Sequence, residues 1–437
     1  MGLAKRFLSV VVVFLLCQLG SAKTVGLWKD ARSAITDGLV QTLTDAGWEI
    51  VSLSGGDLSD WEKLSELDVI FLPGGWNAYN FANFDARRNL VKFVASGKGI
   101  LAGAFRGGYT RTANRVFLPE IGEIYNRVGS PWVEGYGDSE LAKAIEEPMT
   151  AGGFDHLVVK PGPYGKIFAV SANDPIGAYG EVYGGRCVIF GVFLGLDAKT
   201  EPMTGSPKKV LLAIMDWLNS AKKPNDAELQ KNRDLADCEF LRREKRWDWT
   251  FNDRGPDRSA SALPAMRDKK AVELEGRMFR LQYMSQFLSG SALKKCETGI
   301  ADLSKSVERL NVAYERELKA LEEKLNRMTA AELIEAKLDE SLNERLLPEK
   351  ELTNLTDKSD KLISELVPLV EAKKTELLKV EHEKDLANLP NLIKATSSED
   401  AKERLFAVRE LGRIGDIKAE QVFIKLLNDP DAQVRIA

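Results

Sequence analysis

The strongest constraint on the fold is an alternation of short apolar runs with amphipathic segments. The runs at residues 24–28, 48–53, 68–72 and 99–102 have the composition of strands, and the segments between them at 33–46, 57–67 and 84–96 have helical spacing. The run at 68–72 is almost wholly apolar, as expected for a parallel strand that is buried on both faces. Strand–helix alternation of this kind predicts a doubly wound α/β domain with a parallel sheet.

The α/β pattern ends near residue 221. Strands joined by turns are expected over about 155–195, and an amphipathic helix over 207–220 closes a domain that spans residues 23–221. After Ala221 glycine becomes rare, and lysine, glutamate, leucine and aspartate dominate. This shift predicts an all-α region over residues 222–396, with its first helices at 226–247 and 263–290.

Two leucine-rich seams follow inside the helical region. The first has heptad spacing with one stutter, and its members are Leu303, Val307, Leu310, Tyr314, Leu318, Leu321, Leu325 and Met328. The second runs from Leu355 to Val380, and Pro368 is expected to interrupt it. An antiparallel hairpin or coiled coil would bury both seams. The alternative is two solvated helices of a bundle that bind no partner.

Residues 397–437 contain an internal repeat. Arg404 in the segment 400–407 corresponds to Arg435 in the segment 431–437, which gives a period of 31 residues. Short helical segments with turn residues after each resemble the start of a HEAT-type helical repeat array. Stacked repeats need about three units to bury a continuous core. We therefore expect that the natural chain continues past Ala437 or that this sequence is truncated.

The first 22 residues have the features of a secretory signal peptide. Lys5 and Arg6 precede an apolar run over 7–16, and Gly20-Ser21-Ala22 supplies small residues for cleavage. The run is shorter than the ~20 residues that span a membrane. We therefore expect an exported protein, periplasmic or secreted, with no stable membrane span after cleavage. A retained anchor, or lipid attachment at Cys17, is the alternative.

Composition argues against several classes of site. The net charge of −4 does not indicate a nucleic-acid-binding surface, which would be strongly basic. The sequence has only two histidines in 437 residues, so it does not indicate a cluster of metal ligands. No cofactor motif is present either. Cys187, Cys238 and Cys296 are widely spaced, so we expect buried thiols, although an exported compartment would permit one disulfide bridge.

Two motifs resemble those of class I glutamine amidotransferase-like domains. IFLPGGW at 70–76 is similar to their third-strand motif, and GKGILAGAFRGGY at 97–109 is similar to their nucleophile elbow. The nearest resemblance is to the biotin-protein ligase N-terminal-like branch. It covers residues 24–221 and implies a flavodoxin-like domain whose elbow holds a nucleophile on a sharp strand-to-helix turn.

The resemblance also implies that catalysis has been lost. Leu101 stands at the nucleophile position, and Phe193 stands where the family places its histidine. The two histidines of the chain, His156 and His382, lie elsewhere and are expected to be packing or surface residues. Because neither an attacking group nor a base is available, the covalent mechanism of the family is not expected.

The same pocket remains a candidate binding site. Gly74, Gly75, Trp76, Asn77 and Arg106 surround it, and an arginine near a helix N-terminus favours a small anionic ligand. The alternative is that the glycines only form a turn and that the arginine is solvated.

Two functions follow from these observations. The first is a non-catalytic exported binding or scaffolding protein, which contacts protein partners through its helical arms and repeats. The alternative is a hydrolase or amidase that uses a different site in the same pocket, with Asp138 or Asp197 acting together with Asn77 or Arg106.

The signal-peptide assignment predicts that the mature chain begins at Lys23. The mass of protein recovered from the cell envelope or the medium measures this directly. Recovery of the intact chain from Met1 in the cytosol would contradict export.

Overall fold

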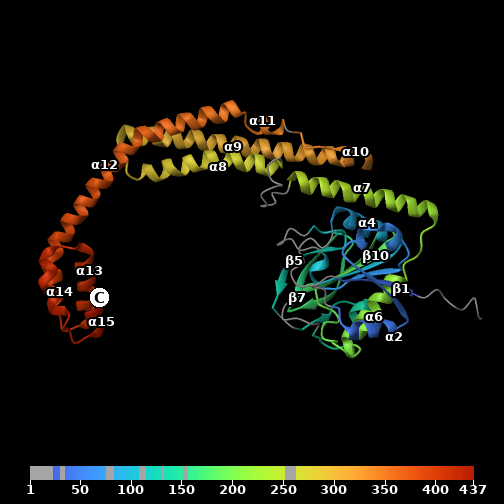
Figure 1. Ribbon diagram of the computed structural model, residues 1–437. Coiled ribbons are helices and arrows are strands. Elements are labelled where there is room, and N and C mark those ends of the chain that lie inside the picture. The colour runs from blue at the N-terminus through green and yellow to red at the C-terminus, as the bar shows by residue number, and fades with distance from the viewer. Residues whose placement is uncertain are drawn as a thin grey trace, which may run out of the picture. The chain divides into compact units, whose positions relative to one another are not determined.

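The computed structural model describes residues 23–29, 35–74, 83–107, 115–129, 132–150, 156–250, 262–339 and 341–437. The predicted signal peptide, residues 1–22, lies outside these ranges. The chain divides into two compact units, coloured by residue number in Figure 1. The first contains residues up to 253 together with 322–337, and the second contains 254–321 and 338–437.

An eight-stranded sheet forms the centre of the first unit, in the order β2-β1-β3-β4-β10-β9-β8-β6. Its parallel strands are β2 (Trp48–Leu53), β1 (Lys23–Trp28), β3 (Val69–Leu72), β4 (Gly99–Gly103) and β10 (Gly185–Phe190). Its antiparallel strands are β9 (Asp174–Val182), β8 (Lys166–Ser171) and β6 (Glu134–Gly135). The predicted α/β domain with a mostly parallel sheet is therefore confirmed.

Two further strands form a small separate sheet. β5 (Gly122–Val128) pairs antiparallel with β7 (His156–Pro161). The predicted series of turn-linked strands is thus divided between two sheets, and its last strand, β10, runs parallel to β4 in the main sheet.

Helices lie on both faces of the main sheet, as its buried apolar strands require. Figure 1 shows α2 (Asp37–Asp45) and α6 (Gly205–Asn219) on one side and α4 (Phe84–Ala95) on the other. The short helices α3 (Trp61–Ser65) and α5 (Glu140–Lys143) complete the domain. The helices begin where the sequence offers a cap. The side chain of Thr36 accepts a hydrogen bond from the Leu39 amide, and Asn83 accepts one from the Ala86 amide.

The first unit extends beyond the predicted boundary at residue 221. Helix α7 (Asp226–Thr250) packs along α4, where the rings of Phe84 and Phe240 lie 5.3 Å apart. Arg88 binds Asp237 through two hydrogen bonds of 2.6 and 2.8 Å. Helix α10 (Ala330–Glu335) packs on α7 in turn. The composition shift after Ala221 marks the start of the purely helical part of the chain. The first compact unit does not end there, because it also includes α7.

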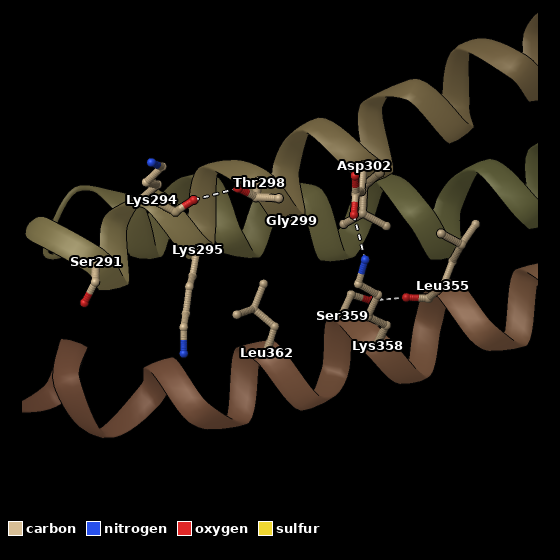
Figure 2. Close-up of a pocket in the computed structure, with 11 residues that line it drawn as sticks. Ser291, Lys294, Lys295, Thr298, Gly299, Asp302, Leu355, Lys358, Ser359 and Leu362 are labelled. Atoms are coloured by element: carbon tan, nitrogen blue, oxygen red, sulfur yellow. Dashed lines mark hydrogen bonds and ion pairs between the residues drawn. The ribbon is translucent and has the colours of Figure 1, made fainter.

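The second unit is helical. Its main helices are α8 (Leu263–Ser285), α9 (Gly290–Arg327), α11 (Leu342–Leu346) and α12 (Glu349–Ala395), and α9 belongs to it as far as residue 321. Part of α9 and α12 lie side by side in Figure 2. The predicted interruption at Pro368 is wrong, because α12 continues through both Pro368 and Pro390. None of the helices in the described ranges is long and apolar enough to cross a membrane.

The buried face of α9 only partly follows the predicted heptad seam. Leu303, Leu310, Leu321 and Leu325 are buried as expected. Between them the buried positions are Ser306, Ala313 and Glu317, whereas the predicted Val307, Tyr314 and Leu318 are only half-buried. Glu317 is compensated by Arg316 and Arg345, which contact its two carboxylate oxygens at 3.0 Å each.

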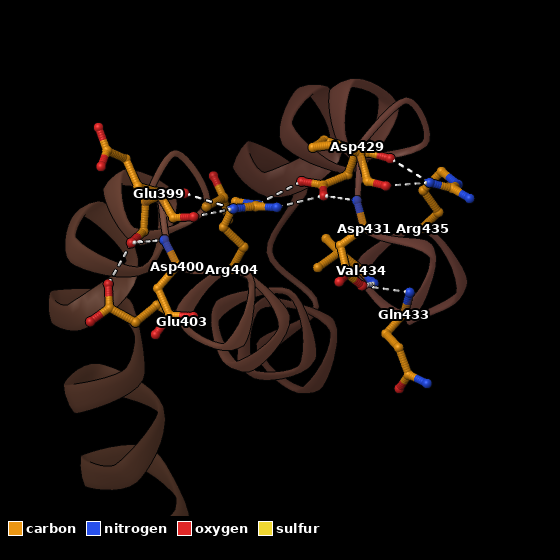
Figure 3. A network of polar contacts seen from close by, with 12 residues as sticks. Glu399, Asp400, Glu403, Arg404, Asp429, Asp431, Gln433, Val434 and Arg435 are labelled. Carbon is orange, nitrogen blue, oxygen red and sulfur yellow. Dashed lines mark hydrogen bonds and ion pairs between the residues drawn. The ribbon is translucent and has the colours of Figure 1, made fainter.

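The C-terminal helices repeat a set of contacts as well as a sequence. The elements are α13 (Ala401–Ile414), α14 (Glu420–Leu426) and α15 (Ala432–Ile436). Arg404 donates to the carbonyls of Ser398 and Glu399, and Arg435 donates in the same way to those of Asp429 and Pro430 (Figure 3). The Asp429 carboxylate accepts two bonds of 2.8 Å from Arg404. One residue thus links the two halves of the repeat.

Leu310 is fully buried, whereas Val312 on the same helix is 62% exposed. We expect Leu310→Ala to lower the free energy of unfolding of the helical unit by about 2–5 kcal/mol, because it leaves a cavity. Val312→Ala serves as the control and should change stability by less than about 0.5 kcal/mol. Urea unfolding followed by circular dichroism measures both, and equal effects would contradict the placement of the buried face.

Candidate functional site

Ligands of doubly wound sheets bind at the carboxyl ends of the parallel strands. Here those ends are the last residue of β1, Trp28, and the turns that follow β3, β4 and β10. The turn after β3 begins at Pro73-Gly74, the turn after β4 begins at Ala104, and the segment after β10 contains Phe193. The predicted binding residues Gly75, Trp76 and Asn77 lie outside the described residues.

The turns after β3 and β4 approach each other closely because both contain glycine. A Cβ atom on Gly74 would lie 2.8 Å from Cβ of Ala104, and one on Gly103 would lie 2.8 Å from the Gly74 nitrogen. Ala104 itself has a φ of 40°, a left-handed conformation that costs energy in a residue with a side chain. This strained residue directly follows β4 and is the first residue of the short 3₁₀ helix Ala104–Gly107.

The structure places Leu101 away from that turn. Leu101 lies in the middle of β4, where it pairs with Phe71 of β3 and Val188 of β10, and its side chain is buried in the core. The sequence prediction put the nucleophile position at Leu101, but the sharp turn occurs at Ala104. Four consecutive small or apolar residues make the register of this motif ambiguous in the sequence.

Phe193, in the segment after β10, lies against the turn that follows β3. Its ring carbon Cδ1 would be 3.0 Å from a Cβ atom on Gly74, and its Cα would be 3.4 Å away. The side chain is only 3% exposed. The segments after three parallel strands therefore meet through Gly74, Ala104 and Phe193. None of these side chains can attack a carbonyl or transfer a proton.

Arg106 is fully buried, which differs from the exposed anion-binding residue that the sequence suggested. Its Nε donates to the Pro73 carbonyl at 3.1 Å, and its guanidinium carbon lies 4.5 Å from the centre of the Trp28 ring. Trp28 in turn donates from Nε1 to the Ser54 carbonyl at 3.0 Å. Arg106 thus bridges the end of β1 and the turn after β3.

The carboxylates of the alternative hydrolase lie on other segments. Asp138 is exposed in the turn before α5. Asp197 follows β10 and lines a cavity of about 390 Å³ whose walls come mainly from residues 194–207. Arg106, Ala104 and Phe193 do not line that cavity. Within the described ranges, no group of three or more histidine, cysteine, aspartate or glutamate residues is arranged to hold a metal ion.

Two further polar side chains near the same edge were not predicted to meet. His156 at the start of β7 is buried, and its Nδ1 lies 3.1 Å from Oγ of Ser171 at the end of β8. The adjacent Leu157 amide donates to the Gly191 carbonyl at 2.8 Å, which holds this pair beside the segment after β10. His156 is therefore a packed, hydrogen-bonded residue, as expected from the sequence, but its partner could not be identified there.

The comparisons with known proteins assign no family to this chain. No protein-family model matches the chain, and no curated protein does. Similar solved structures include a cytoplasmic protein of Salmonella typhimurium, with 13% identity, a TM-score of 0.35, and coverage of 45% of this chain and 98% of that one. PurLQS from Thermotoga maritima has 15% identity, a TM-score of 0.30, and coverage of 45% and 99%.

A third similar structure also contains a helical part. It is a two-domain protein of Anabaena variabilis with DJ-1/ThiJ/PfpI-like and ferritin-like domains, with 13% identity, a TM-score of 0.20, and coverage of 81% of this chain and 96% of that one. All three TM-scores are low, and these likenesses assign no activity or ligand to this chain.

Burial raises the pKa of the Cys187 thiol above its ordinary range, and the charge of Glu120 adds to the shift. Cys187 lies within β10 and is fully buried, whereas Cys238 on α7 is half-buried. We expect iodoacetamide at pH 8 to alkylate Cys238 in the folded protein and to leave Cys187 unmodified until the protein is unfolded. Peptide mass spectrometry measures this, and equal rates at the two thiols would contradict it.

Proposed function

We propose that this chain is an exported, non-catalytic binding or scaffolding protein, and that its first unit is a degenerate class I amidotransferase-like domain of flavodoxin-like topology. The strand order supports the assignment of topology. The five parallel strands, numbered along the chain, are arranged 2-1-3-4-5, which is the order of flavodoxin-like sheets. The small residues at the turn after β4 support the resemblance to a nucleophile elbow.

The observation that carries the proposal is the contact of Gly74, Ala104 and Phe193. In our interpretation Ala104, rather than Leu101, takes the place of the nucleophile, because it has the left-handed conformation expected at the apex of an elbow. Phe193 takes the place of the base. Both positions are apolar, so neither of them can supply a nucleophile or a base.

The arrangement of Arg106 argues against an open ligand crevice between β1 and β3. Flavodoxin-like domains bind ligands at the point where the strand order reverses, which is the gap between those two strands. Here the guanidinium of Arg106 spans the ends of both, against Trp28 and the Pro73 carbonyl. A small anionic ligand bound through an exposed Arg106 is therefore not part of the proposal.

The helical parts are better suited to contact a partner. Large apolar side chains are exposed on α8 and α12, where Phe279 is 73% and Leu378 is 66% exposed. In the C-terminal segment, which we interpret as HEAT-type, Leu427 is 64% and Ile417 is 81% exposed. In this proposal the exposed apolar side chains of these helices supply the protein contacts.

The test of the proposal is an attempt to restore catalysis. We expect the purified chain and its Ala104→Cys variant to show no hydrolysis of glutamine or of activated esters, because a thiol without a base stays mostly protonated near a pKa of ~8.5. Ala104→Cys combined with Phe193→His should exceed the single variant by about 100-fold, the usual contribution of a general base. Leu101→Cys with Phe193→His is the matched control and should stay inactive.

Steady-state turnover measured with these substrates decides the matter. Turnover by the unmodified chain that is lost in Ala104→Trp would show that the edge of the sheet is catalytic after all. Restoration by Leu101→Cys instead of Ala104→Cys would show that the elbow position is misassigned.

A further inference from the structure

The second unit contains a groove between α9 and α12 that the proposed function does not use. We propose that this groove binds a free single-chain anionic amphiphile, a molecule with an apolar chain and a carboxylate head. The groove lies wholly in the helical unit, so the proposal is independent of the degenerate site in the α/β domain.

The groove has the size of a small-molecule site. Its volume is about 440 Å³, and ligand pockets usually measure about 300–1,000 Å³. Gly299 of α9 lets a side chain of α12 approach the α9 backbone closely. A Cβ atom on Gly299 would lie 2.6 Å from Cδ2 of Leu362 and 3.2 Å from Cδ1 of Leu281. The Leu362 side chain therefore lies against the backbone of α9 at Gly299.

Its walls are apolar and incompletely covered. Leu303 of α9 is buried, but Leu355 and Leu362 of α12 are only half-buried, although both line the space between the helices. Figure 2 shows the Leu362 side chain directed from α12 towards α9. An apolar chain that covered these leucines would remove their surface from water, which is favourable in proportion to the area buried.

Charge is available near the Ser291 end of the groove. Lys358, which lies between Leu355 and Leu362 along α12, is neutralised, because its Nζ lies 2.7 Å from a carboxylate oxygen of Asp302 (Figure 2). Near the Ser291 end, Lys294 and Lys295 both line the groove. Figure 2 shows the Lys295 side chain extending towards α12, whereas the ammonium of Lys294 is directed away from α12.

This polarity orients the ligand. A carboxylate at the open end can accept hydrogen bonds from the Lys295 ammonium and the Ser291 hydroxyl. The chain then passes Leu362 and the Lys358–Asp302 pair towards Leu355. A partner helix fits less well, because its diameter of about 10–12 Å exceeds the space left where Leu362 touches α9 at Gly299.

The test is calorimetric titration of the full chain with dodecanoate below its micelle concentration. We expect saturable binding at one site, about tenfold weaker in Lys295→Gln, because a hydrogen bond to a charged group is lost. Lys305→Gln is the matched control, since Lys305 is exposed on α9 and does not line the groove, and should change the affinity by less than about twofold. 1-Dodecanol, which has the chain without the charge, should bind about as weakly to the unmodified protein as dodecanoate does to Lys295→Gln.

A second pair of variants tests the apolar wall. Leu362→Gln should weaken dodecanoate binding, and Leu369→Gln, on α12 but outside the groove, should not.

Absence of saturable binding by dodecanoate overturns the proposal, as does an equal effect of the two lysine variants. Cosedimentation of the chain with anionic phospholipid vesicles that is lost in Lys295→Gln, without binding of free dodecanoate, would overturn it in favour of a membrane contact. Lys295 is exposed on its helix, so its variant is expected to fold, and circular dichroism verifies this.

Discussion

The first unit depends on the close packing of three backbone segments at the carboxyl edge of its sheet. Gly74 and Gly103 let the turns after β3 and β4 approach, and Phe193 closes the space from the segment after β10. In an active elbow the same geometry would expose a nucleophile to a crevice. Here apolar atoms fill it, and Arg106 spans the neighbouring gap between β1 and β3. The side chains at this turn serve packing.

A second constraint is the ionic contact that fixes α7 to the α/β domain. Glu244 is buried on α7, where it lies 2.6 Å from Arg87 of α4 and also binds Arg115. Loss of one partner from a buried pair of this kind costs about 3–5 kcal/mol, because the remaining charge stays uncompensated. Helix α7 therefore belongs to the α/β unit despite its composition.

The helical unit shows how polar side chains enter a long helical interface. Ser306 and Glu317 occupy buried positions of α9, and Glu317 is tolerated because Arg316 and Arg345 neutralise it. At the other end of the unit, Asp429 accepts hydrogen bonds from Arg404 through its side chain and from Arg435 through its carbonyl. The two arginines that correspond in the sequence repeat therefore both bind Asp429 in the structure.

The sequence by itself determined most of the elements of this protein, although β5 and β6 were not predicted. Apolar runs separated by helical segments indicated β1 to β4, and leucine spacing indicated the long helices, because these patterns reflect burial within one element. Only the tertiary structure decided how the elements meet. The left-handed turn after β4 occurs at Ala104, which the sequence did not indicate, because backbone dihedrals cannot be read from a run of small residues. Arg106 is buried because of Trp28, which is distant in sequence. Helix α12 continues through Pro368 because a proline inside a helix removes one backbone hydrogen bond, and packing along the rest of a long helix can outweigh that loss.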